Sequence, residues 1–298
     1  MVRRVAHPQQ VSETADVSAV RRRSSLRPAI LAALVLAASA SRPLAEQVVD
    51  PGAGESSLSL ECRVPGAQLY TAAKLGAVQT ALAEKRPIRL LAIGGSAAPG
   101  ASASYPAKLE AALERALPKV DVVIDHRGLP GEIASGAAER LRTMVVEAEP
   151  DLIVWQVGTH DAIARVDAEA FEAALNEAVA WIRSHGIDVV LVDPIYTASM
   201  AGDADYNRIV DAVRTVATQQ QVPLVRRYEA LHYLSSRIDR GEGHFLGRQF
   251  RLNDLGLRCM AEHVALTIVS SLAKTDTPVD PKSAPAAPPL TGTQRAPG

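Results

Sequence analysis

The sequence predicts an α/β protein: a three-layer α/β/α sandwich built around a five-stranded parallel sheet. Two observations support this prediction. Five short apolar segments alternate along the chain with longer segments of helical periodicity, which is typical of a parallel sheet with helices on both faces. The first apolar segment, Ile88–Ile93, is also apolar on both faces, as expected of a strand buried inside such a sheet.

The expected elements follow one another in a single domain over residues 62–273. Strands are predicted at 88–94, 120–125, 152–157, 187–193 and 222–226. Helices are predicted at 68–85, 105–117, 132–149, 168–185, 205–220 and 253–272, where apolar residues recur at helical spacing.

Composition limits the function classes. The chain has 298 residues, a net charge of -1 and only 4% aromatic residues, so neither a basic nucleic-acid-binding surface nor an aromatic stacking platform is indicated. The histidines form no HExxH pattern and the two cysteines no CxxC, so we predict no metal site and no cofactor. The glycine-rich stretch 94–100 lacks the phosphate-binding pattern GxxxxGK[ST], which argues against nucleotide binding.

The first 40 residues are expected to be a secretory signal peptide. Arginines at 21–23 and 27 precede a short apolar run, Pro28–Ala40, which ends in Ala-Ser-Ala. The alternative is an uncleaved membrane anchor. Residues 41–61 are predicted to be a linker and residues 274–298 a disordered tail, because both are polar and rich in turn-forming or small residues. We therefore expect a periplasmic or secreted protein that is free of the membrane after cleavage.

Export also predicts a disulfide. The chain has two cysteines, Cys62 and Cys259, and disulfides persist in oxidising compartments. The bridge would join a position before the first helix to the last helix. The alternative is two independent buried thiols.

The candidate site residues follow the predicted strands. Ser96 comes directly after Gly94-Gly95 at the end of the first strand, and glycines permit a tight turn there. The segment His126–Gly131 follows the second strand, and Gly158–Asp161 follows the third. Because ligands bind at the carboxyl ends of the strands in such sheets, these segments are expected to meet at one edge. The alternative for Ser96 is that it only caps the next helix.

In four stretches the chain resembles the SGNH/GDSL hydrolase family. Gly94-Gly95-Ser96 with Gly100 is similar to that family's first block, GDSxxxG, with Gly95 in place of Asp. The segment 126–131 is similar to its N-x-G-x-x-G block, and 158–161 to its G-x-N-D block. The segment 248–256 matches the last block, D-x-x-H-x-N-x-x-G, in Asn253 and Gly256. The resemblance runs from about residue 62 to 272 and implies a flavodoxin-like SGNH hydrolase fold.

The resemblance also implies a hydrolase that acts on ester bonds, on a small-molecule ester or an acylated carbohydrate. Ser96 would be the nucleophile and the Gly131 N–H an oxyanion donor. Beyond the differences in the first two blocks, three positions with catalytic roles in the family carry other residues. His160 stands at the oxyanion Asn, while Arg248 and Arg251 stand at the Asp and His of the last block. Arginine stays protonated in proteins, so Arg251 cannot be the general base.

The missing base leaves three alternatives open. His244, seven residues before Arg251, is a candidate substitute base; the alternative is a solvated loop histidine. His160 is itself a candidate base or oxyanion donor; the alternative is a neutral packing residue. The arginines at 248 and 251 would hold an anionic ligand beside Ser96, or else form a solvated face.

We expect the remaining charged residues at strand ends to have structural rather than catalytic roles. Asp161 is expected to cap the segment after Gly158, and Asp193 to start a turn before Pro194. Arg226 and Arg227 are expected to be a solvated charge pair. The sequence thus leaves two functions open: a serine esterase or acyl hydrolase with a rearranged base, or a catalytically inactive protein of the same fold that binds a carbohydrate or an anionic ester.

Overall fold

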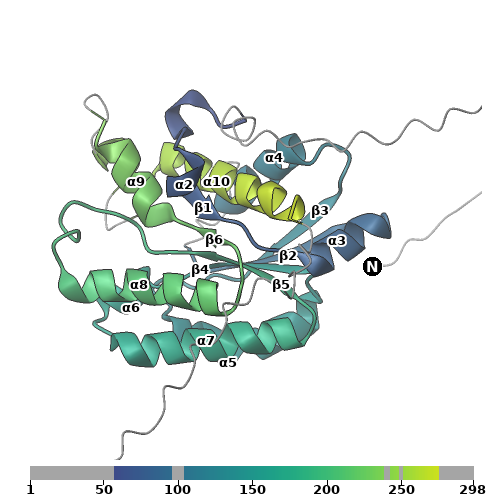
Figure 1. Cartoon of the computed structure of the whole chain (residues 1–298), viewed down its shortest axis with the longest axis horizontal. Coiled ribbons are helices and arrows are strands. Elements are labelled where there is room, and N and C mark those ends of the chain that lie inside the picture. Colours follow the sequence, from purple (N-terminus) through teal and green to yellow (C-terminus); the bar gives the residue numbers. More distant parts are fainter. Residues whose placement is uncertain (1–56, 96–103, 238–241, 248–250, 275–298) are drawn as a thin grey trace, which may run out of the picture. The chain divides into compact units, whose positions relative to one another are not determined.

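A six-stranded sheet separates two layers of helices, as Figure 1 shows. The computed structural model describes residues 57–95, 104–237, 242–247 and 251–274. The predicted signal peptide, most of the predicted linker and nearly all of the predicted tail lie outside these residues. The predicted α/β/α architecture is confirmed.

The spatial strand order is β1-β6-β5-β4-β2-β3, and every neighbouring pair is parallel except β1 with β6. The strand bounds are β1 Tyr70–Thr71, β2 Ile88–Ile93, β3 Val122–His126, β4 Leu152–Gln156, β5 Asp188–Val192 and β6 Leu224–Val225. The five predicted strands are all present, each within two residues of its predicted start.

The predicted count of five strands is wrong by one, because β1 lies inside the segment predicted to be a helix at 68–85. That segment forms two short helices, α2 Gly66–Leu69 and α3 Gly76–Ala83, with β1 after the first. Tyr70 and Thr71 pair antiparallel with Val225 and Leu224. A two-residue strand is too short to show alternation, so apolar spacing alone favoured a continuous helix.

The helices divide between the two faces of the sheet. One face carries α5 Ala134–Ala148, α6 Thr159–Ile163, α7 Ala168–Ser184 and α8 Ala204–Gln219; the other carries α3, α4 Tyr105–Ala116 and α10 Asp254–Leu272. Alternate residues of β4 enter the two cores: Ile153 and Trp155 face one, Leu152 and Val154 the other. Burial on both faces explains why this strand is an unbroken apolar run.

A third apolar cluster forms around α9 Arg227–Ser235, α2 and the short 3-10 helix η1 Leu60–Cys62. The sequence did not predict α9 or α6. Within the segment predicted to be a linker, Leu58 is buried and Ser59 donates two hydrogen bonds to Glu262. Packing therefore begins several residues before Cys62.

Helix α10 is long enough and apolar enough to span a membrane. No other helix among the described residues meets both criteria. In the structure 67% of its apolar window is buried within the protein, in contact with α4 and the sheet. Burial of this kind is typical of a central core helix.

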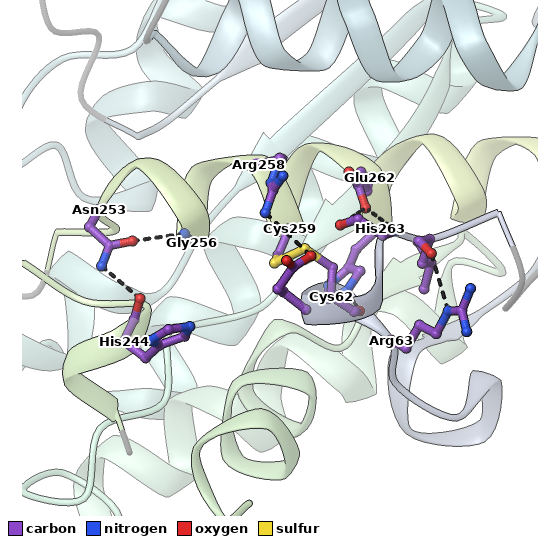
Figure 2. Close-up of a disulfide and its surroundings, with 12 residues drawn as sticks. Cys62, Arg63, His244, Asn253, Gly256, Arg258, Cys259, Glu262 and His263 are labelled. Carbon is purple, nitrogen blue, oxygen red and sulfur yellow. Dashed lines mark hydrogen bonds and ion pairs between the residues drawn. A yellow bond between two sulfur atoms is a disulfide. The ribbon is translucent and has the colours of Figure 1, made fainter. Parts of the chain in front are cut away.

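The disulfide joins Cys62 in η1 to Cys259 in α10, the pair that the sequence predicts (Figure 2). Their Cα atoms are 5.0 Å apart, and both residues are almost completely buried. A hydrogen bond of 2.7 Å joins the His263 Nε2 atom to the Cys62 carbonyl beside it. The start and the end of the domain are thus tied together by covalent and polar links.

Gly94, the residue directly after β2, occupies a position that only glycine fits. Its φ is +82°, and a Cβ atom there would lie 2.2 Å from the backbone oxygen of Gln156. Both the left-handed backbone and the clash disfavour a side chain.

We expect Gly94→Ala to lower the free energy of unfolding by about 3 kcal/mol, as the sum of backbone strain and overpacking. Gly186→Ala is the matched control, because Gly186 has a similar φ of +72° but open space around its Cβ position. It should lose only about 1 kcal/mol. Urea denaturation of the two variants measures the difference, and equal losses would show that the contact with Gln156 has no effect.

Candidate active site

A cavity of about 460 Å³ opens at the carboxyl ends of β2 and β4. Its walls are the turn after β2, the starts of α4, α5, α6 and α9, and the first half of α10. Apolar side chains cover much of the wall, including Ile93, Trp155, Val157, Leu257 and Met260. This is the edge of the sheet where the sequence places the functional segments.

The turn after β2 packs closely against the segment that follows β3. A Cβ atom on Gly128 would lie 2.4 Å from the carbonyl oxygen of Gly95, so only glycine fits there. A hydrogen bond of 3.2 Å joins His126 Nε2 to the Gly94 carbonyl, with the imidazole donating. Gly95 is the last described residue before Ser96, and both Ser96 and Arg248 lie outside the described residues.

His160 is the second residue of α6, and it lines the cavity together with Gly131. Gly158 precedes this helix with a φ of +92°, and Pro194 and Ile209 pack against it. Burial lowers the pKa of His160, and the positive charges of Arg227 and Arg251 lower it further, whereas Asp161 opposes them. The imidazole is therefore neutral near pH 7 and able to accept a proton.

Asp161 connects the starts of two helices. Its carboxylate accepts a hydrogen bond of 2.8 Å from the backbone N–H of Ala134, the first residue of α5. Burial raises the pKa of Asp161, while this bond and backbone groups of its own segment oppose the shift. The Asp161 side chain thus accepts from the start of α5, whereas the prediction placed its cap on the segment after Gly158, and the bond fixes α6, which carries His160, against α5.

Arg227 is not solvated, so that part of the prediction for Arg226 and Arg227 is wrong. Its side chain is only 6% exposed and lines the cavity. The cause is α9, which begins directly after β6 and turns its first residue inward. Arg226 is half-buried and donates to the Ala67 carbonyl.

Asp193 is completely buried, and its side chain caps α9, a role that the predicted turn before Pro194 does not include. One carboxylate oxygen accepts a hydrogen bond of 2.8 Å from the Tyr228 N–H. The other has no hydrogen bond within the described residues. Burial and the nearby negative charge of Glu229 raise the pKa of Asp193 to about 7.

This raised pKa predicts a pH-dependent stability. In the unfolded chain the carboxyl group would ionise near its ordinary value, so between about pH 4 and pH 7 only the folded state keeps the proton. Stability contributed by this group is therefore lost as the pH rises through that window. We expect Asp193→Asn to remove this part of the slope in the unfolding free energy, measured by urea denaturation at several pH values. An unchanged slope would contradict the assignment.

The structure brings Gly131, His160 and Arg251 to the wall of one cavity, but it does not bring His244 there. His244 is exposed, and its ring packs edge-on against Phe245. Its carbonyl accepts a hydrogen bond from Asn253, whose side chain also caps α10 at Gly256 (Figure 2). The Asn and Gly of the last block thus hold this loop against the helix start.

Sequence reasoning missed three polar residues of the cavity wall: Tyr105, Gln156 and Arg227. Gln156 could have been recognised from the sequence, because it is a polar residue at the end of an otherwise apolar strand. Tyr105 and Arg227 gave none, because nothing in their local pattern distinguishes inward from outward orientation.

Comparisons with known proteins identify a family and solved structures that are similar to this chain. A model of the Non-GDSL lipase-like family matches residues 61–274. Among solved structures, TesA is 21% identical with a TM-score of 0.51, over 60% of this chain and 97% of that chain. A lipase/acylhydrolase from Enterococcus faecalis is 19% identical with a TM-score of 0.52, over 61% and 96% of the two chains. LAE5, a hydrolase from the metagenome of Lake Arreo in Spain, is 20% identical with a TM-score of 0.54, over 63% and 98%. No curated protein sequence matches the chain.

Proposed function

Because the chain belongs to the Non-GDSL lipase-like family, we propose that it is a serine ester hydrolase with Ser96 as nucleophile and His160 as general base. The observation that carries the proposal is the position of His160. It is half-buried, its pKa is lowered by burial, and it lines the cavity that begins at Gly95, one residue before Ser96. The chain shares its fold with a lipase/acylhydrolase and an acetyl xylan esterase, and the family match favours the same class of reaction.

The proposed reaction has two stages. The Ser96 oxygen attacks the ester carbonyl carbon while His160 takes the hydroxyl proton, and the Gly131 N–H stabilises the carbonyl oxygen as it gains negative charge. The intermediate then expels the alcohol, which takes the proton from His160, and leaves an acyl-serine. Water attacks the acyl-serine in the same way and releases the acid.

The cavity supports a small substrate. Its volume and largely apolar wall suit a short acyl chain or a small acylated carbohydrate rather than a long lipid. We also propose that the protein acts outside the cytoplasm, in the periplasm or as a secreted protein. The predicted signal peptide and the Cys62–Cys259 disulfide support this location, since disulfides persist in oxidising compartments.

A second candidate function is ligand binding without catalysis. The observation that favours it is Arg251, which lines the cavity at the position where the resembled family has its histidine base. A guanidinium cannot accept a proton near neutral pH, whereas it binds anions well.

Covalent labelling separates these two functions. A fluorophosphonate forms a bond between phosphorus and an activated serine oxygen, and fluoride leaves. We expect one label on the wild-type protein, located at Ser96 by peptide mass mapping, and none on Ser96→Ala. Wild-type protein that takes no label and releases no p-nitrophenol from p-nitrophenyl acetate would refute the hydrolase and favour the binding protein.

A further inference from the structure

A buried arginine at the cavity wall, Arg227, forms no ion pair with a carboxylate among the described residues, and the nearest compensating charge is the buried Asp193 carboxyl group, whose raised pKa of about 7 leaves it partly protonated near neutral pH. The Arg227 guanidinium donates to the Asp193 carbonyl (2.8 Å), the Gln156 amide oxygen (3.2 Å) and the Thr159 hydroxyl (3.3 Å). All three acceptors are uncharged. A buried charge is normally paired, so this arrangement favours an anion that comes from outside the chain.

Two further donors lie at the same end of the cavity, the Tyr105 hydroxyl and the Gln156 amide nitrogen. Their side chains are neighbours, but neither atom forms a hydrogen bond of standard geometry in the described structure. Tyr105 is 3% and Gln156 9% exposed. Such buried groups are normally satisfied, and each unsatisfied one destabilises the protein. Both would gain a partner if an anion bound next to Arg227.

The carboxylates of the cavity wall do not neutralise Arg227. Glu132 forms an ion pair of 2.7 Å with Arg140. Asp161 accepts the backbone N–H of Ala134 at the start of α5. Behind the wall, the carboxylate of Glu229 pairs with Arg214.

One of the three donors, the Gln156 amide nitrogen, lies close to Gly95, the last described residue of the turn after β2. A Cβ atom on Gly95 would be 3.2 Å from the Gln156 amide nitrogen, and Gly95 directly precedes Ser96. An anion bound by Gln156 would therefore lie next to the turn that leads to the proposed nucleophile.

We propose that Tyr105, Gln156 and Arg227 form a carboxylate-binding subsite, and that the protein takes esters whose short acyl chain ends in a carboxylate, such as monoesters of succinic acid. A single guanidinium with two neutral donors matches one negative charge, which favours a carboxylate over a dianionic phosphate. The substrate class rests on the proposed function, but binding of the carboxylate does not require hydrolysis.

The test compares monomethyl succinate with dimethyl succinate, which differ in charge but little in shape. Their dissociation constants are measured by isothermal titration calorimetry on Ser96→Ala, which prevents turnover. We expect monomethyl succinate to bind at least about tenfold more tightly. The variant Ser96→Ala with Arg227→Gln should lose this preference. The matched control with Arg226→Gln should keep it, because Arg226 does not line the cavity.

Tyr105→Phe provides a second measurement if Arg227→Gln fails to fold, as judged by circular dichroism. It removes only a hydroxyl that forms no hydrogen bond of standard geometry in the described structure, so the fold should persist while the preference falls severalfold. Equal affinities of the two succinate esters, or a preference unchanged in the variants, would overturn the subsite. Tighter competition by inorganic phosphate than by acetate would overturn the choice of carboxylate. A carboxylate preference without fluorophosphonate labelling would refute the hydrolase but not the subsite.

Discussion

Replacement of His160 by alanine should lower kcat/KM for p-nitrophenyl acetate by about 100- to 10,000-fold, the usual contribution of a general base. The reason is that Arg251 occupies the position of the family's base and cannot accept a proton, whereas His160 lines the same cavity as a neutral imidazole. The pH profile should agree. Because the base acts in its neutral form and its pKa is lowered, activity should rise with pH below the ordinary histidine value and be level by about pH 7.

His160→Asn separates the two roles that this residue could have. Asparagine keeps a side-chain donor for the oxyanion but cannot act as a base. If His160 is the base, the asparagine variant should be about as inactive as the alanine variant. High activity in His160→Asn would identify His160 as an oxyanion donor only. His244→Ala is the control, since His244 is exposed and lies outside the cavity wall; a loss confined to that variant would identify His244 as the base.

Removal of the disulfide should produce the largest loss of stability. In the chain-entropy model a bridge across 197 residues stabilises the folded state by about 5 kcal/mol, and measured losses are commonly about 2–5 kcal/mol. We expect the double variant Cys62→Ser, Cys259→Ser to lose stability in this range in urea denaturation. Such a loss is a large part of the total stability of a typical domain.

Reduction of the wild-type protein is the matched control, because it breaks the same bond without changing either side chain to serine. Under dithiothreitol the wild type should approach the double variant in urea midpoint, and the double variant should not respond. A wild-type midpoint that dithiothreitol leaves unchanged, with both thiols shown to be free, would contradict the predicted contribution.

The sequence predicted those parts of the fold that depend on periodicity and composition. The strands appeared as apolar runs because both faces of the sheet are covered, and the long helices appeared through their repeated apolar positions. Strand β1 and helices α6 and α9 could not be recognised in this way. They span from two to nine residues and therefore give little periodic signal. Their existence depends on pairing and packing with distant segments, which a local pattern does not contain.

The sequence predicted mainly those site residues whose segment directly follows a strand of the sheet. Gly131 and His160 do meet at one cavity, because the carboxyl ends of parallel strands share an edge. Arg251 joins them from the segment before α10. The burial of Asp193 and Arg227 was not predictable from charge, because charged residues are usually solvated. Arg227 is buried because a single residue separates α9 from β6 and the first residue of α9 turns toward the cavity, and Asp193, at the end of β5, is buried because it caps the start of α9. Both are properties of the topology.

The contact between Gly95 and Gln156 has an evolutionary consequence. The family resembled by this chain carries aspartate at the position of Gly95, but here a Cβ atom would lie 3.0 Å from the Gln156 amide oxygen, on a backbone with a φ of +72°. Glycine at one position and a long amide side chain at the other therefore form a matched pair. Homologous chains that regain the aspartate should carry a smaller residue at the position of Gln156, so the two positions are expected to vary together. The unusual glycine of the first block is then the partner of a strand residue 61 positions away in the sequence, rather than an isolated loss.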